Sequence, residues 1–221
     1  MSIIPEQSKV QQPVIDFHTV IKERRSVRKY DASHKLTDEE IRELLSAAVL
    51  APSGSNMQPW RFIVITDPEL KQKLLPVAFN QEQIVSSSAV IAVLVDLEAY
   101  KQAPRIYAKA VEAGYMNVET ADKLIGNMNK FYGGLSRDRV LHGALIDGGL
   151  VSQQLMLAAR ARGLDTVPMA GYNTDQFREM FGVSERYANV MLIAVGKAAE
   201  PGHPTVRLSV DDVTSWNGFH Q

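Results

Sequence analysis

The spacing of apolar residues predicts a chain that interleaves helices and strands. In residues 14–23, Phe17, Val20 and Ile21 share one helical face. Thr37 and Glu40 have the spacing of a capping box, which opens a helix to about residue 51. Further helices are expected from Pro68, through most of 97–135, over 137–162 and over 174–181.

Three apolar stretches predict strands. Residues 61–66 are rich in β-branched side chains, whereas 89–96 and 189–195 are continuous apolar runs expected to be buried on both faces. Residues 165–172 carry Pro168 and Gly171 and are expected to be short and turn-like. The pattern alone leaves the direction of the strands open.

Length and composition predict one globular domain. The chain has 221 residues, of which 45% are hydrophobic, and its net charge is −1. Residues 1–13 are polar and are expected to form a flexible tail before a single domain over 14–221. No signal-like segment or bilayer-length apolar run is found, so a cytoplasmic protein without a membrane partner is the simplest interpretation.

The absence of cysteine removes several kinds of chemistry. With 0 Cys there can be no disulfide, thiolate metal site, iron–sulfur cluster or cysteine nucleophile. The five histidines lack metal-ligand spacing, and the phosphate-loop, serine-elbow and zinc-helix motifs are missing. Redox chemistry in this chain would therefore need an organic cofactor.

Residues 24–30, RRSVRKY, are the first motif that could bind a ligand. Guanidinium groups hold phosphate through paired, charge-assisted hydrogen bonds, and Ser26 can add another. From spacing alone a solvated basic turn is the simpler interpretation. A nucleic-acid partner is not expected, because the rest of the chain supplies no basic excess.

Three further stretches offer polar groups. Residues 51–60, APSGSNMQPW, combine a flexible glycine with hydroxyl, amide and indole groups, and suit a ligand loop or a tight helix-to-strand connection equally. Residues 163–172, GLDTVPMAGY, could present backbone N–H groups to a flat ring or form an ordinary turn. Lys197 and Arg207 could bind an anion or lie on the surface.

Together and in this order, these motifs resemble the FMN-dependent nitroreductase family. RRSVRKY, APSGSNMQPWRF, FNQEQ, GLDTVPMAGY and the C-terminal VGK with Arg207 span nearly the whole chain. The resemblance implies an α+β nitroreductase fold, a mixed and largely antiparallel sheet flanked by helices, in an intertwined homodimer. The long helix over 137–162 would lie at the dimer core and the C-terminal segment would cross the partner. FMN would bind between the subunits.

The resemblance also implies roles for individual residues. Arg24, Arg25, Ser26 and Arg207 match positions that hold the phosphate and ribityl chain, with Lys197 a weaker candidate. Arg28, Asn80 and Gln83 match positions at the pyrimidine edge. The partner subunit would contribute Pro52, Ser53 and Asn56, and the isoalloxazine would lie against Pro168, Met169, Ala170 and Gly171.

Two positions depart from the pattern of the relatives. Ala170 replaces a glutamate found in some relatives, which removes a side-chain contact but leaves the backbone N–H for flavin N5. Gln83 replaces a common lysine, so Arg28 is left as the main positive charge near the pyrimidine and the flavin potential is expected to be lower.

The activity implied is that of an NAD(P)H oxidoreductase of the nitroreductase or quinone reductase type. NADH or NADPH would give hydride to flavin N5, and a nitroaromatic or quinone would then take it in the same pocket, by a ping-pong mechanism. No catalytic side chain is required, and residues 97–135 are expected to form the lid over the acceptor. The alternatives are a non-redox FMN-binding or storage protein, a relative with altered flavin chemistry, and a phosphate-binding or nucleic-acid-binding module.

Overall fold

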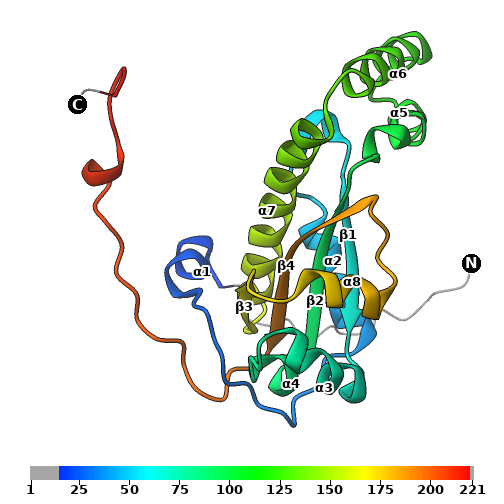
Figure 1. Ribbon diagram of the computed structural model, residues 1–221. Helices are drawn as coiled ribbons and strands as arrows, with labels where there is room; N and C mark the ends of the chain where they lie inside the picture. Colours follow the sequence, from blue (N-terminus) through cyan, green and yellow to red (C-terminus); the bar gives the residue numbers. More distant parts are fainter. Residues whose placement is uncertain (1–14, 220–221) are drawn as a thin grey trace, which may run out of the picture.

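A four-stranded antiparallel sheet forms the centre of the computed structural model, which describes residues 15–219 (Figure 1). The strands lie in the order β1 (Trp60–Ile65), β2 (Ala89–Asp96), β4 (Tyr187–Gly196) and β3 (Asp165–Met169). Every residue of β2 is buried, as the continuous apolar run predicts. The expected tail at 1–13 lies outside the described residues.

Helices cover both faces of the sheet. On one face, Leu74 of α3 (Pro68–Val77), Ile84 of α4 (Gln83–Ser86) and Phe177 of α8 (Thr174–Phe181) pack with Val90, Ala92 and Leu94 of β2. On the other face, α2 (Asp38–Ala48) and α7 (Arg137–Ala161) pack against Ala89, Ile91 and Val93. Because side chains alternate along β2, this one strand supplies both cores.

The predicted helix ends are mostly confirmed. The Thr37 hydroxyl accepts from the Glu40 N–H while the Glu40 carboxylate accepts from the Thr37 N–H, which completes the capping box of α2. Asp67 caps α3 ahead of Pro68, and α7 stops before Gly163, whose φ of 73° favours glycine. The first helix, α1, is shorter than predicted and covers Phe17–Glu23.

The turn-like prediction for residues 165–172 is wrong in its first half. Asp165–Met169 forms strand β3, which pairs with β4 from Asp165 opposite Gly196 to Met169 opposite Leu192. Pro168 is tolerated because β3 is an edge strand of this sheet, and no further strand on its outer side needs the N–H that proline lacks. Beyond it, Ser26 forms an isolated parallel bridge with Thr166, so the arrangement is mixed and largely antiparallel.

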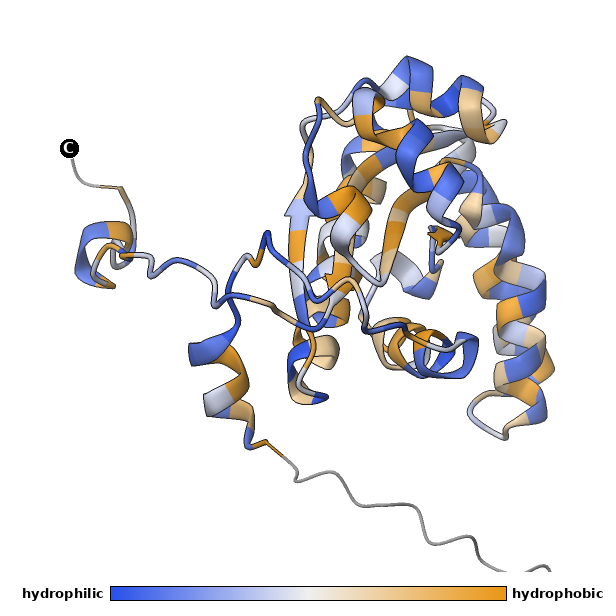
Figure 2. Ribbon diagram, turned by 90° about the horizontal axis from the view of Figure 1, so that it is seen from below, coloured by the Kyte–Doolittle hydropathy of each residue, from blue (hydrophilic) through white to orange (hydrophobic). Residues whose placement is uncertain are grey.

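Two parts of the chain extend beyond the sheet and its helices. The 3-10 turn η2 (Ala99–Gln102) leads into α5 (Ala103–Glu112) and α6 (Val118–Gly133), which form a projecting hairpin with a small core of its own (Figure 1). The helical prediction for residues 97–135 is thus confirmed. The C-terminal segment, residues 203–219 with the turn η3 (Asp211–Val213), runs away from the body and mixes polar with apolar residues (Figure 2).

Candidate functional site

The basic motif lies along the outer edge of β3. The Val27 N–H donates to the Thr166 carbonyl at 3.1 Å, next to the bridge between Ser26 and Thr166. Gly202 packs closely against the same segment, since a Cβ added there would come within 2.6 Å of the Arg25 Cβ. The start of the C-terminal segment is therefore held against the motif, a role for Gly202 that the sequence did not reveal.

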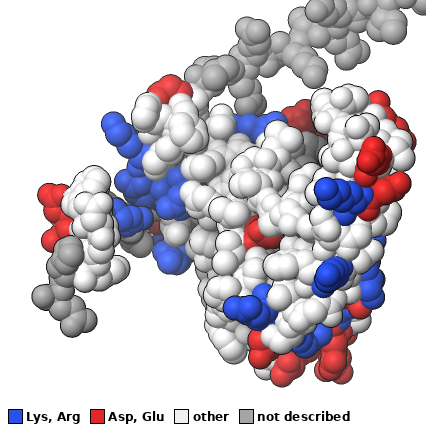
Figure 3. All heavy atoms as spheres, turned by 90° about the horizontal axis from the view of Figure 1, so that it is seen from above, with Lys and Arg blue, Asp and Glu red and all other residues white. Residues whose placement is uncertain are grey.

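Arg24 lies among positive charges. Burial, and then the charges of Arg207 and Arg25, lower the pKa of the Arg24 guanidinium. Over residues 15–219 none of five cations makes a salt bridge: Arg24, Arg25, Arg28, Lys197 and Arg207. Lys and Arg atoms gather where the C-terminal segment leaves the body (Figure 3). Half-buried arginines without a protein counter-ion fit an anionic ligand such as a phosphate.

The turn between α3 and α4 meets the far end of β3. Gln81 Nε2 donates to the Gly171 carbonyl at 2.8 Å, and Gln83 Nε2 lies 3.0 Å from Gln81 Oε1 and 3.3 Å from Met169 Sδ. Asn80 has a φ of 56°, a left-handed conformation that an asparagine tolerates. Gln81 was missed from the sequence; it links the two predicted segments.

Strand β3 joins these two groups into one elongated site. Its first residues adjoin the arginine motif, and its last residue leads into the exposed Ala170 and Gly171 beside the α3–α4 turn. Five extended residues span about 16 Å. The arrangement suits a long ligand with an anionic group at one end and a flat polar group at the other.

The loop of residues 52–58 is not brought to this site within one protomer. Its Gly54 N–H donates to Asp147 of α7, whereas Arg160, near the other end of α7, pairs with Glu23 and Asp165 beside the arginine motif. Arg160 follows Asp147 by thirteen helical positions, which is about 20 Å along the axis. Pro52, Ser53 and Asn56 therefore form a second group on the same protomer, apart from the arginine motif.

The backbone of this loop is strained in a defined way. Ser55, Asn56 and Gln58 all have positive φ, at 52°, 57° and 49°. The Gln58 N–H donates to Ser53 Oγ at 3.0 Å, and Gln58 Nε2 donates to the Asn56 carbonyl at 3.2 Å. Such strain persists where surrounding contacts enforce it, and it is common at ligand-binding sites.

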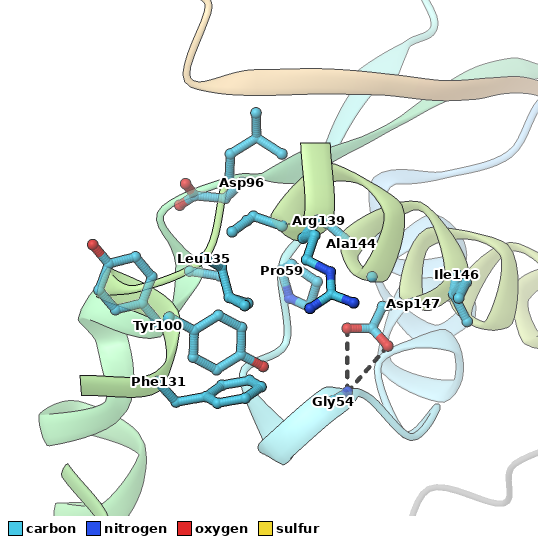
Figure 4. A pocket seen from close by; sticks show the side chains of 15 residues that line it. Gly54, Pro59, Asp96, Tyr100, Phe131, Leu135, Arg139, Ala144, Ile146 and Asp147 are labelled. Carbon is cyan, nitrogen blue, oxygen red and sulfur yellow. Dashed lines mark hydrogen bonds between the residues drawn. The ribbon is translucent and has the colours of Figure 1, made fainter. Parts of the chain in front are cut away.

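A cavity of about 430 Å³ opens beside the loop (Figure 4). Tyr100 and Tyr132 stack with ring centroids 5.6 Å apart, and Phe131 meets Tyr132 edge to face. Asp147 lies at the polar end, where burial raises the pKa of its carboxyl although the Gly54 N–H opposes that shift. The aromatic wall comes from the segment expected to act as a lid.

Comparison with known proteins identifies the family. Residues 21–197 match the nitroreductase family, and the chain belongs to it. YdgI of Bacillus subtilis, provisionally named an NAD(P)H nitroreductase, is 48% identical over 203 residues, covering 91% of this chain and 97% of that protein. The CLA biosynthesis enone reductase of Lactiplantibacillus plantarum is 34% identical over 194 residues, covering 86% of this chain and 89% of that protein.

A solved structure extends the match to three dimensions. The crystal structure of a provisionally assigned nitroreductase from Exiguobacterium sibiricum in complex with FMN gives a TM-score of 0.90 at 47% identity, covering 93% of this chain and 99% of that one. The resemblance inferred from the motifs and the α+β fold class are thereby confirmed. Within residues 15–219, no cluster of His, Asp and Glu suits a metal ion, and no helix is long and apolar enough to cross a bilayer.

Proposed function

We propose that this protein is an FMN-dependent NAD(P)H oxidoreductase of the nitroreductase or quinone reductase type. The observation that carries the proposal is the cluster of Arg24, Arg25 and Arg207 at one end of β3, which makes no salt bridge within residues 15–219. Family membership and the FMN complex of a 47% identical relative support it. When bound, FMN supplies hydride transfer between a nicotinamide donor and an acceptor, and the protein supplies binding and orientation.

Each part of the elongated site has a task in this proposal. Arg24, Arg25, Ser26 and Arg207 hold the phosphate, with Lys197 in a lesser role. Arg28, Asn80 and Gln83 bind the pyrimidine edge of the ring. Pro168, Met169, Ala170 and Gly171 lie along the ring, where exposed backbone at the end of β3 is free to donate hydrogen bonds. These residues fit the group because the cations have no competing carboxylate partner in residues 15–219.

The protein works as a homodimer in this proposal. Apolar side chains are exposed along α7 and the C-terminal segment, including Ile146 at 55% and Val206 at 94%. A partner that covers both would remove this surface from water. The same partner would bring its own Pro52, Ser53 and Asn56, whose loop contacts α7 about 20 Å along the helix axis from the end beside the arginine motif. The site would then be complete only between two subunits.

The acceptor is proposed to be a small flat oxidised compound, a nitroaromatic or a quinone. The cavity beside the loop has stacked aromatic walls from Tyr100, Tyr132 and Phe131 and a polar end at Asp147. Such walls favour stacking of a flat ring. No side chain is assigned as a proton donor, because solvent reaches an open cavity of this kind.

Visible spectroscopy tests the function directly. The purified protein supplied with FMN should be yellow, should lose the flavin absorbance when NADH or NADPH is added without oxygen, and should regain it on addition of menadione or a nitrobenzoate. A yellow protein inert to both donors would favour the alternative, an FMN-binding or storage protein. A colourless protein that binds oligonucleotides with steep salt dependence would refute the proposal.

A further inference from the structure

A second cavity lies between residues 56–61 and α5. Its volume is about 410 Å³, within the range of small-molecule sites. It is lined by cations, amides and aromatic rings, and none of its lining residues is acidic: Asn56, Gln58, Trp60, Arg61, Gln102, Arg105, Ile106, Lys109, Ala110 and Tyr115.

Two of the three cations have no carboxylate partner in the described part of the chain. Arg61 donates to Asp96 at 2.9 Å, whereas Arg105 and Lys109 make no salt bridge among residues 15–219. Arg105 and Lys109 are four residues apart on α5, so they lie on one helical face and repel each other. An anionic ligand bound between the two side chains would be attracted to both and would offset their mutual repulsion.

The remaining lining groups are those that recognise a nucleoside. Tyr115 is 84% exposed just beyond α5, and its ring is free to stack on a base. The amides of Asn56, Gln58 and Gln102 offer both donors and acceptors. Phosphate charge, a flat base and ribose hydroxyls together match this set of groups.

The cavity shares Asn56 with the residues proposed to bind the flavin. Asn56 lines it and also belongs to the strained loop 52–58, which we assign to the cofactor of the partner subunit. When the nicotinamide ring of NADH or NADPH reaches that flavin, the adenosine half of the molecule must lie elsewhere on the protein surface. Because Asn56 and Gln58 of the loop also line the α5 cavity, that half of the donor can bind in this cavity.

We propose that the α5 cavity binds the phosphorylated adenosine half of the donor and selects NADPH over NADH. The inference rests on the proposed oxidoreductase function. NADPH differs from NADH by one phosphomonoester, which carries a charge between −1.5 and −2 at about pH 7. Arg105 and Lys109, which have no counter-ion among residues 15–219, are the groups that discriminate between the donors.

The test is a double variant, Arg105→Ala with Lys109→Ala, assayed in the FMN-loaded enzyme with menadione. The wild type should have the higher kcat/KM with NADPH. The variant should lose roughly ten- to hundredfold with NADPH, as expected for charged hydrogen bonds, and change little with NADH. The matched control removes two exposed cations from the neighbouring helix α6, Lys123→Ala with Lys130→Ala, and should leave both donors unaffected.

Calorimetry supplies a readout that is independent of turnover. Adenosine 2′,5′-bisphosphate should bind the wild type and the α6 control, and bind the Arg105/Lys109 variant at least tenfold more weakly. Inorganic phosphate at the same concentration should not compete. Equal donor preference in the wild type, equal losses with both donors, or unchanged bisphosphate affinity would overturn the assignment. A yellow enzyme that prefers NADH refutes only this inference, whereas a protein that takes up no FMN refutes the proposed function itself.

Discussion

The backbone N–H of Gly54 donates to both carboxylate oxygens of Asp147, at 3.1 and 3.2 Å. This contact ties the strained loop 52–58 to the middle of α7 across 93 residues of sequence. Gly54 also lies beside Tyr132, since a Cβ added to it would be 3.5 Å from the Tyr132 hydroxyl. The loop, α7 and the α5–α6 hairpin therefore meet at one point.

Two substitutions of Asp147 should distinguish the effect of its charge on stability from the effect of its hydrogen bond. Asp147→Ala leaves the Gly54 N–H without its acceptor and should lower the free energy of unfolding by about 1–2 kcal/mol. Asp147→Asn keeps an acceptor and removes a charge whose burial is unfavourable, so at pH 7 it should be neutral or stabilising. Urea unfolding at pH 7 distinguishes these outcomes, and equal losses in both variants would show that charge is what matters.

Asp96 should make the stability of the fold depend on pH in the acid range. Its side chain is fully buried, and burial by itself raises the pKa of the carboxyl. Hydrogen bonds from Arg186 and from the Glu98 N–H, together with the charges of Arg61 and Arg186, outweigh burial and lower the pKa overall. A depressed folded-state pKa contributes stability above the unfolded value of 3.8, and that stability is lost as pH falls below it.

Asp96→Asn tests this linkage. At pH 6 the variant should be less stable by about 1–3 kcal/mol, because charged hydrogen bonds to Arg61 and Arg186 are lost. The difference from the wild type should shrink as pH falls below 3.8, where the wild-type carboxylate also becomes protonated. Urea midpoints at a series of pH values measure it, with Asp38→Asn on the exposed start of α2 as the control. A constant difference at all pH values would contradict the linkage.

Local patterns predicted most of the fold, and the errors have physical causes. The apolar run at 89–96 and the capping box at Thr37 depend on neighbouring residues, so both were correct. Strand β3 was missed because Pro168 and Gly171 are turn residues, and only the long-range pairing with β4 makes the segment extended. The sequence suggested each site segment separately, but not the Gly54–Asp147 or Gln81–Gly171 contacts, which join residues about 90 positions apart.

Arg24→Ala should weaken FMN binding without weakening the fold. Loss of charged hydrogen bonds to phosphate should reduce FMN affinity by about 1.5–3 kcal/mol. The same change removes one of several repelling charges, so the FMN-free protein should be as stable as the wild type or more so. Fluorescence titration and thermal unfolding measure the two effects. Arg42→Ala on the exposed face of α2 should alter neither, and unchanged FMN affinity in Arg24→Ala would contradict the assignment.

Gln83→Lys should raise the flavin midpoint potential. Gln83 is only 6% exposed and its amide lies against Met169 and Gln81, at the end of the site assigned to the ring. An added positive charge there favours the more negative reduced form of the flavin. Spectroelectrochemical titration of both proteins measures the shift, with the neutral change Gln83→Met as the control. No upward shift would refute a pyrimidine-edge role for this position.

Truncation after Pro204, compared with full-length Arg207→Ala, should separate assembly from phosphate binding. It removes the exposed apolar side chains of the C-terminal segment, including Trp216 at 79% exposed, together with Arg207. We expect the truncated chain to be monomeric by light scattering and to retain no FMN, because the partner's cover and one phosphate ligand are both lost. Full-length Arg207→Ala should remain dimeric and bind FMN more weakly. A truncated chain that stays dimeric would show that α7 alone holds the subunits together, and dimeric protein that still binds FMN tightly would remove Arg207 from the site.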